Sequence, residues 1–257
     1  MLFEPIILGN PIVLKEIDLS CNKLERISTY TFEGLTLLTF INLKNNSITA
    51  IDDYAFQDAK DLLFLLLQEN EIKHIGARTF VGLSRLLALV LRSNALTSIE
   101  NNAFSDLQTL TTLLLHSNKL TLIEKDTFTG LKDLEDLNIS NNSITRILAC
   151  SASKSKVPSL RFLNLKENPI KYIGPNSFSN STRVEITLGE VFFCCARIHY
   201  QNKPYFTTKN CTYKNKIEDF YSFDKTRCEK ADLALNHNTR KQGKLGDHRV
   251  GNGSSDL

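Results

Sequence analysis

The stretch LTTLLLHSNKLTLIEKDTFTGL, residues 110–131, decides the fold of this chain. Leu113 and Leu115 stand two residues apart, so their side chains point to the same side of a β-strand. Asn118 comes three residues after Leu115, and Phe128 comes ten residues after the asparagine. The stretch therefore predicts one short strand, then an inward turn, then an apolar anchor further along the chain.

The same unit recurs along most of the chain. Asparagine returns every 24 residues, with a last step of 26, at Asn22, Asn46, Asn70, Asn94, Asn118, Asn142 and Asn168. A phenylalanine follows six of them at a distance of ten, namely Phe32, Phe56, Phe80, Phe104, Phe128 and Phe178. The strand pair recurs at Ile17 and Leu19, Ile41 and Leu43, Leu65 and Leu67, Leu89 and Leu91, Leu137 and Ile139, and Leu163 and Leu165. A fixed period of this length indicates a solenoid whose stacked turns share one core.

The asparagines and phenylalanines have structural roles in this prediction. A buried turn leaves backbone N–H and C=O groups without strand partners, and an asparagine amide can both donate to and accept from such groups. We therefore expect a column of asparagines at the turns. The phenylalanines are expected to form a spine between the strands and the opposite wall.

The full pattern, Leu-x-x-Leu-x-Leu-x-x-Asn-x-Leu-x-x-Ile followed by Phe-x-x-Leu, resembles the leucine-rich repeat over residues 12–188. The resemblance implies an α/β repeat solenoid, a horseshoe with a parallel β-sheet on its concave face and a disulfide-rich C-terminal cap. We expect three regions. They are a solenoid of about seven repeats and a partial first one at residues 1–190, a cysteine-rich cap or hinge at 191–230, and a disordered polar tail at 231–257.

Composition excludes several functions. The net charge is only +3, from 31 basic and 28 acidic residues, and no basic stripe is present, so nucleic acid is not an expected partner. Apolar runs such as residues 62–67 are far shorter than the ~20 residues of a membrane span. Residues 1–10 lack the features of a signal peptide, and a cysteine-rich N-terminal cap is missing, so the chain is expected to be incomplete at its N-terminus; a natural start without a cap is the alternative.

Six cysteines indicate an oxidising compartment, because four of them gather after the last repeat: Cys194, Cys195, Cys211 and Cys228. We expect them to form disulfides in the cap. A zinc site is the alternative, but an adjacent cysteine pair lacks the usual ligand spacing. Cys21 and Cys150 lie five repeats apart, about 24 Å along the sheet, and cannot pair with each other. Glycosylation motifs agree with an extracellular or cell-surface location; they occur at Asn45, Asn138, Asn141, Asn180, Asn210 and Asn252.

Side chains that flank the inward strand positions should lie on the concave face. In the middle repeats these positions are apolar where solvent is expected, and a polar edge follows each strand. An apolar centre with a charged rim is typical of a protein-binding surface, although strand propensity alone also favours such residues. The candidate partner-binding residues are Phe40, Lys44, Leu63, Phe64, Leu66, Leu87, Val90, Arg92, Leu114 and His116.

The sequence carries no catalytic pattern. Its five histidines are scattered, and it has neither a glycine-rich phosphate loop nor a Gly-x-Ser-x-Gly elbow. We expect no enzyme activity, no cofactor and no metal. His116, near Asp136 and Arg92 on the concave face, is either a pH-sensitive contact or a solvated rim histidine.

Residues 190–198, EVFFCCARI, resemble the end of the repeat array in leucine-rich-repeat-containing G-protein-coupled receptors, which include the glycoprotein-hormone receptors. Cys194, Cys195, Ala196 and Ile198 approximate the family motif, whereas Arg197 departs from it, and no membrane helices follow. The resemblance implies a hormone-receptor ectodomain, or a fragment of one, that binds a secreted protein or peptide ligand. The parent protein would then be anchored in a membrane. The alternatives are a secreted or matrix protein for adhesion or scaffolding, and a fragment of an innate-immunity receptor.

Overall fold

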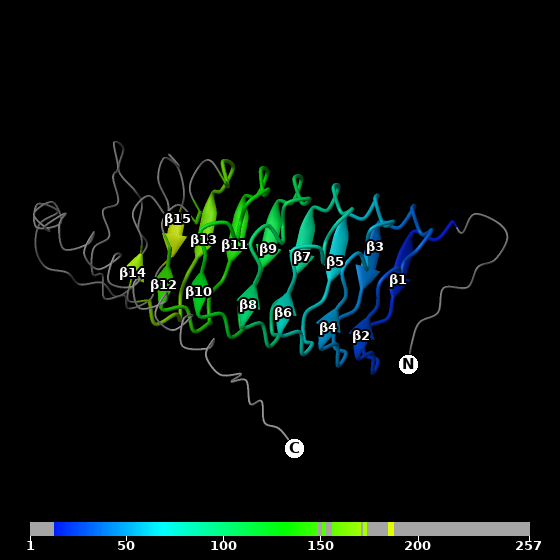
Figure 1. Cartoon of the computed structure of the whole chain (residues 1–257), viewed down its shortest axis with the longest axis horizontal. Helices are drawn as coiled ribbons and strands as arrows, with labels where there is room; N and C mark the ends of the chain where they lie inside the picture. Colours follow the sequence, from blue (N-terminus) through cyan, green and yellow to red (C-terminus); the bar gives the residue numbers. More distant parts are fainter. Residues whose placement is uncertain (1–12, 149–150, 153–155, 171, 174–184, 188–257) are drawn as a thin grey trace, which may run out of the picture. The chain divides into compact units, whose positions relative to one another are not determined.

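The computed structural model describes residues 13–148, 151–152, 156–170, 172–173 and 185–187, which form a parallel β-solenoid (Figure 1). The main sheet has eight strands, all parallel, and each turn of the chain adds one strand beside the last. They are β1 (Glu16–Asp18), β3 (Phe40–Asn42), β5 (Phe64–Leu66), β7 (Ala88–Val90), β9 (Thr112–Leu114), β11 (Asp136–Asn138), β13 (Phe162–Asn164) and β15 (Glu185–Thr187). The predicted repeat solenoid with a parallel sheet is confirmed. The expected cap at 191–230 and tail at 231–257 lie outside the described residues.

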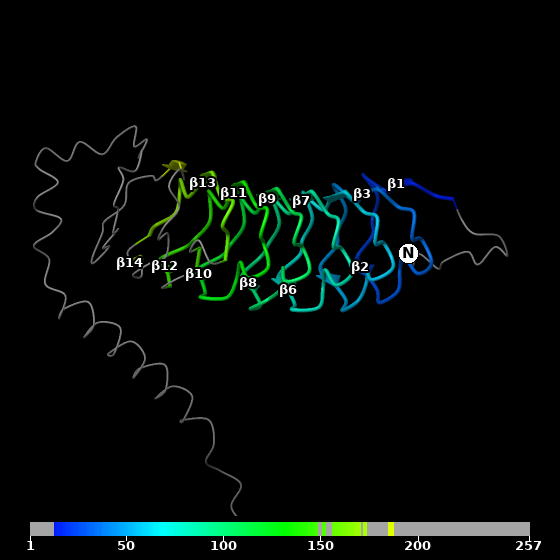
Figure 2. The ribbon, with the colours of Figure 1, turned by 90° about the horizontal axis from the view of Figure 1, so that it is seen from above.

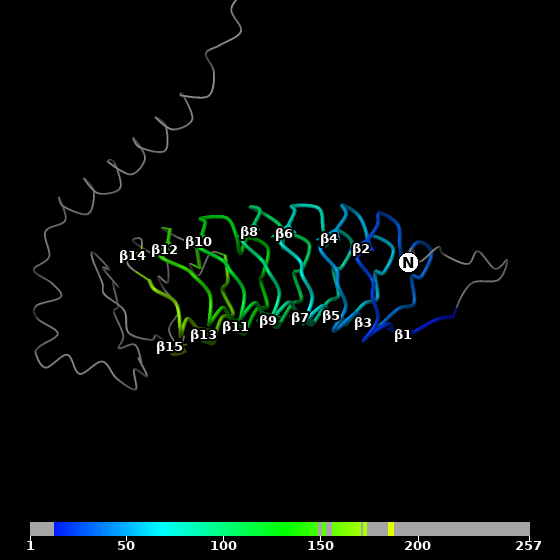
Figure 3. The same ribbon diagram turned by 90° about the horizontal axis from the view of Figure 1, so that it is seen from below.

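A second row of strands lies opposite the main sheet (Figures 2 and 3). These strands are two residues long and form three small parallel sheets. They are β2 (Arg26–Ile27), β4 (Ala50–Ile51), β6 (His74–Ile75), β8 (Ser98–Ile99), β10 (Leu122–Ile123), β12 (Arg146–Ile147) and β14 (Tyr172–Ile173). Within the described residues, the connections between main-sheet strands contain these strands and turns and no helix.

The apolar core fills the space between the two rows. The middle residue of each main-sheet strand from β1 to β13 is buried, as for Ile41 and Leu89, because alternate side chains of a strand face opposite ways. Behind the sheet runs the predicted spine of phenylalanines. The rings of Phe56 and Phe80 stack with centroids 6.3 Å apart, and those of Phe80 and Phe104 with centroids 6.1 Å apart.

The asparagine column satisfies the turns as predicted. Asn94 is buried, and its Oδ1 accepts the backbone N–H of Ile72 at 3.0 Å. Its Nδ2 donates to the carbonyl of Leu67 in the preceding turn at 2.9 Å and to that of Leu91 in its own turn at 3.1 Å. The same three bonds recur at the ladder asparagines 46, 70, 118, 142 and 168. Each amide therefore joins neighbouring turns.

The register of the main sheet follows the sequence period. Residues 24 apart lie side by side, as Phe40 does with Phe64, up to β11. Between β11 and β13 the step is 26, since Asp136 pairs with Phe162. The two extra residues do not disturb the sheet, and Ala152, which takes the phenylalanine position of this longer repeat, is buried.

Gly130 is expected to tolerate no side chain. Its φ is +101°, and a Cβ atom there would lie 2.5 Å from Ser105 Cα and 2.6 Å from Ser105 O. We expect Gly130→Ala to lower the free energy of unfolding by roughly 2–5 kcal/mol, the sum of left-handed strain and overpacking. Gly34, with φ +71° and open space around the Cβ position, is the matched control. Denaturant unfolding should show that Gly34→Ala costs only about 1–2 kcal/mol. Equal losses in the two variants would contradict the steric argument.

Candidate functional site

The outer face of the main sheet is apolar at its centre. In β5 the middle residue Leu65 is buried, whereas Phe64 is 41% exposed and Leu66 is half-buried. The register places Phe40 beside Phe64, and Leu66 beside Val90, which in turn lies beside Leu114. We call this contiguous surface the sheet-face patch; it consists of Phe40, Leu63, Phe64, Leu66, Leu87, Val90 and Leu114. All seven side chains are half-buried or exposed, so the structure leaves each of them accessible at the surface.

A polar edge follows the strands of the sheet-face patch, and its charged groups are paired. Glu69 accepts from Arg92 Nη2 at 3.1 Å and lies 3.6 Å from Lys44 Nζ. Glu69 has a left-handed backbone with φ 60°, and its N–H donates to the carbonyl of Arg92 in the next turn at 3.1 Å. The predicted edge residues Lys44 and Arg92 are thus held together by one carboxylate, a contact that the sequence analysis did not predict.

His116 and Gln68 lie on either side of Arg92 along the same edge, one in each neighbouring turn. Burial, and to a smaller extent the positive charge of Arg92, lowers the pKa of His116. Its Nδ1 is buried and has no hydrogen-bond partner among the described residues; the same is true of Gln68 Oε1. Because the neutral imidazole is favoured, His116 adds no positive charge to this edge at neutral pH.

Two aspartates at opposite ends of the sheet-face patch have different environments. Asp18 accepts from the hydroxyl of Ser20 at 2.6 Å, from the N–H of Ser20 at 2.9 Å and from Asn42 Nδ2 at 3.2 Å. These bonds lower the pKa of Asp18. Burial raises the pKa of Asp136, which lies beside Phe162, a residue that is 47% exposed. Asp136 and Phe162 were not predicted as binding residues, because they lie beyond the apolar centre.

Of the six cysteines, Cys21 is the one that lies within the described residues. Cys21 is free and exposed, and its Sγ lies 3.4 Å from Asn45 Nδ2. Cys150 and the four cysteines predicted to form disulfides lie outside the described residues.

Three of the predicted glycosylation motifs are described. Asn45 and Asn141 are exposed at equivalent turn positions and have left-handed backbones. Asn138 lies on the sheet face, half-buried, and its Oδ1 accepts from Ser140 N and Oγ. Asn45 and Asn141 are thus the more accessible acceptors. The motifs at Asn180, Asn210 and Asn252 lie outside the described residues.

A serine, a histidine and a glutamate meet on the wall opposite the main sheet. His74 Nδ1 lies 2.8 Å from Ser98 Oγ, and His74 Nε2 lies 3.2 Å from Glu100 Oε1. All three residues are exposed, and the second oxygen of Glu100 accepts the N–H of Ala77 at 2.8 Å. Catalytic nucleophiles generally lie in shielded sites, whereas these three side chains are exposed to solvent. The three residues form a surface contact between neighbouring turns.

Other kinds of site find no support in the described part of the chain. No three histidine, cysteine, aspartate or glutamate side chains gather there to hold a metal ion. No helix in the same residues combines the length and the apolar character that crossing a bilayer requires.

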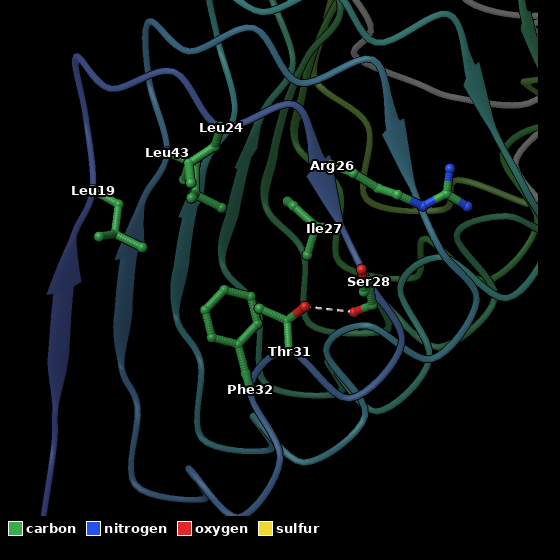
Figure 4. A pocket seen from close by; sticks show the side chains of 8 residues that line it. All are labelled: Leu19, Leu24, Arg26, Ile27, Ser28, Thr31, Phe32 and Leu43. Carbon is green, nitrogen blue, oxygen red and sulfur yellow. Dashed lines mark hydrogen bonds between the residues drawn. The ribbon is translucent and has the colours of Figure 1, made fainter. Parts of the chain in front are cut away.

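A small hollow lies at the first turn of the solenoid (Figure 4). Its walls are mainly apolar, Thr31 Oγ1 donates to the Ser28 carbonyl at 2.6 Å, and the Arg26 side chain extends away from it. The lining residues are Leu19, Leu24, Arg26, Ile27, Ser28, Thr31, Phe32 and Leu43. Because Phe32 and Leu43 belong to the core, we interpret the hollow as a packing gap between the main sheet and the opposite row of strands.

Comparison with known proteins agrees with the geometry. A family model described as "Leucine rich repeat" matches residues 12–72, 62–120 and 108–170. No curated protein sequence matches the chain. Among solved structures, the Toll–Spatzle complex from Drosophila contains a chain that is similar to this one at 25% identity with a TM-score of 0.62. The similarity covers 69% of this chain but only 25% of that chain, so this chain corresponds to a quarter of its length. The matched segments extend over more than half of the sequence, and the chain therefore belongs to the leucine-rich repeat family.

Proposed function

We propose that this chain is an extracellular protein-binding module whose sheet-face patch binds a secreted protein or peptide ligand. The observation that carries the proposal is the contiguous apolar surface across β3, β5, β7 and β9, with charged residues along its edge. Apolar surface of this extent on a solvent-facing sheet is typical of a partner-binding site. An apolar centre with a polar rim is also the usual anatomy of a protein interface.

A protein or peptide suits this surface better than a small molecule does. Small ligands bind in concave pockets that bury most of their surface, whereas the sheet-face patch extends over four neighbouring strands. Phe64 is its most exposed large side chain, and aromatic residues near the centre of an interface contribute much of the binding energy. Phe64 is therefore the proposed central contact.

Two receptor classes fit this module. The Cys194–Cys195–Ala196 segment supports the ectodomain of a G-protein-coupled hormone receptor, by resemblance to the hinge of that group. The structural similarity to a chain of the Toll–Spatzle complex, described as a hub in development and innate immunity, supports a Toll-like receptor ectodomain. For either class the proposed partner is a secreted protein. Exposed glycosylation motifs at Asn45 and Asn141 support an extracellular or cell-surface location for either.

The transcript downstream of residue 257 separates the two classes. Seven apolar segments of ~20 residues would support the hormone-receptor class, and one such segment would support the Toll-like class. A stop codon without any span would support a secreted adhesion or scaffold protein instead.

Substitution of Phe64 and Leu66 tests the binding face directly. The full chain, dimerised through an antibody Fc fusion, would be screened against a panel of secreted proteins by biolayer interferometry. For a ligand found in this way, we expect Phe64→Asp combined with Leu66→Ser to weaken binding by about 100-fold or more, because two central contacts are lost.

The control for this experiment is Tyr30→Asp. Tyr30 is 45% exposed and follows β2 on the opposite wall, so its replacement should leave binding unchanged. Circular dichroism and thermal unfolding would establish that both variants fold. A folded double variant that retains full affinity for the ligand would show that the sheet-face patch is not the binding surface.

A further inference from the structure

Asp136 is a half-buried carboxylate on the outer face of the main sheet. It lies in β11, with Thr112 of β9 on one side and Phe162 of β13 on the other (Figure 1). No described residue donates a hydrogen bond to its carboxylate or forms an ion pair with it. Burial without a partner is unfavourable for a carboxylate, and burial indeed raises the pKa of Asp136.

The neighbouring carboxylates on this face differ from Asp136. Glu135 pairs with Arg161 at 3.3 Å, and Asp18 and Glu69 have the partners described above. Glu16, on β1, has no partner among the described residues, but it is exposed and water can solvate it. Asp136 thus is partly buried and has no cationic or hydrogen-bonding neighbour among the described residues. A cation on a ligand would therefore gain more binding free energy at Asp136 than at the other carboxylates of this face.

The side chain beside Asp136 indicates which cation fits. Phe162 is 47% exposed, so its ring is accessible next to the carboxylate. A guanidinium group can bind a carboxylate with two hydrogen bonds and stack on an aromatic ring, whereas an ammonium group is a compact, strongly hydrated point charge. We propose that Asp136 and Phe162 form a subsite for an arginine side chain of the ligand. This inference rests on the proposed function, since the same ligand would occupy the sheet-face patch.

Spacing along the sheet sets where this arginine lies relative to the apolar contacts. Asp136 is three strands from Phe64 in the order β5-β7-β9-β11, which is about 14 Å at the usual strand separation. In an extended peptide, residues i and i+4 lie on the same side and about 13.5 Å apart. A peptide that crosses the strands would therefore place an aromatic side chain at Phe64 and an arginine at Asp136. Its middle residue would lie over Ala88 and Thr112, which the register places between Phe64 and Asp136.

Two short peptides test the inference on the full chain. The probes are fluorescein-labelled Phe-Thr-Leu-Thr-Arg-amide and the reversed sequence, because the peptide can cross the sheet in either direction. Fluorescence polarisation would give Kd for each probe and for the analogue in which citrulline, which is neutral and nearly isosteric, replaces arginine. For the better probe, we expect citrulline to raise Kd by about 10-fold on the native chain, the scale of a partly desolvated charged hydrogen bond.

Variants of the subsite should remove that preference. On Asp136→Asn we expect arginine and citrulline probes to differ by less than about two-fold, because the amide cannot attract the cation. Glu16→Gln, which changes an exposed carboxylate on the same face, should retain the roughly 10-fold difference expected on the native chain. A lysine probe should bind about three-fold more weakly than the arginine probe, and Phe162→Leu should reduce that difference, because the stacking contribution is lost while the bonds to Asp136 remain.

Three results would overturn the inference. The first is an undiminished arginine preference on Asp136→Asn, which would place the cation elsewhere. The second is the absence of binding by both probes at about 1 mM, a concentration at which even weak contacts are detected. The third is an equal loss of preference on Glu16→Gln. None of these results affects the proposed function, because that proposal fails only if Phe64→Asp with Leu66→Ser leaves binding of the protein ligand intact.

Discussion

Replacing Phe80 with alanine is expected to lower the free energy of unfolding by about 4 kcal/mol. Phe80 is 1% exposed, and its ring stacks between those of Phe56 and Phe104 in the neighbouring turns. The variant loses the transfer free energy of the ring, leaves a cavity in the middle of the spine and removes two aromatic contacts. Equilibrium unfolding in urea, followed by circular dichroism, measures the loss.

Phe64→Ala is the matched control for this prediction. Phe64 is the same residue type in the same turn, but it is 41% exposed on the sheet face, so its truncation should cost only about 1–2 kcal/mol. Because stacked repeats unfold cooperatively only while their interfaces hold, Phe80→Ala is also expected to broaden the transition. A loss of similar size in both variants would contradict the assignment of Phe80 to the core spine.

Asn94→Ala is expected to lower the free energy of unfolding by about 3 kcal/mol. Without the amide, the Ile72 N–H loses its partner, and the Leu67 and Leu91 carbonyls each lose one of two amide donors, since they still accept from Asn70 and Asn118. A buried N–H that is left unsatisfied costs about 1–3 kcal/mol, each lost bond to a carbonyl adds about 1 kcal/mol, and relaxation of the turn recovers part of the sum. The same urea titration detects this change.

Asn22→Ala tests whether the loss of stability depends on burial of the asparagine rather than on the residue type. Asn22 occupies the equivalent position in the first turn but is exposed, and its Nδ2 donates to the carbonyls of Leu19 and Ser20. Water can replace these bonds, so we expect a loss below about 1 kcal/mol. Equal losses of stability in Asn94→Ala and Asn22→Ala would show that the buried hydrogen bonds between turns do not stabilise the column.

The sequence predicted the main sheet well because its signals are local and repeated. Pairs such as Leu113 and Leu115 set which side of each strand is buried, and the 24-residue period sets the register. It did not predict the two-residue strands of the opposite wall. Their signal is an isoleucine three residues after a leucine, as for Leu96 and Ile99, and it is too short to distinguish a strand from a turn.

The candidate site was predictable as a surface and only partly as a set of interactions. Counting along the repeat identified Phe64, Leu66 and Val90 as outward-facing, and the structure places them there. The bridging role of Glu69 between Lys44 and Arg92 was not predicted. Neither was the contact of His74 with Ser98 and Glu100, because these partners come from different turns of the solenoid.

By itself, the sequence determined that the chain is a repeat solenoid, which side chains face the core, and which apolar residues lie on the open sheet face. These properties depend on the alternation of a strand and on a constant period, and both can be read along the chain. Only the tertiary structure decided which outward charges are neutralised. Asn42 in the next turn donates to Asp18, whereas no described residue donates to Asp136, although both aspartates lie at sheet-face positions of their turns. The physical reason is that contacts between turns join residues about 24 positions apart, so they form only when the turns stack.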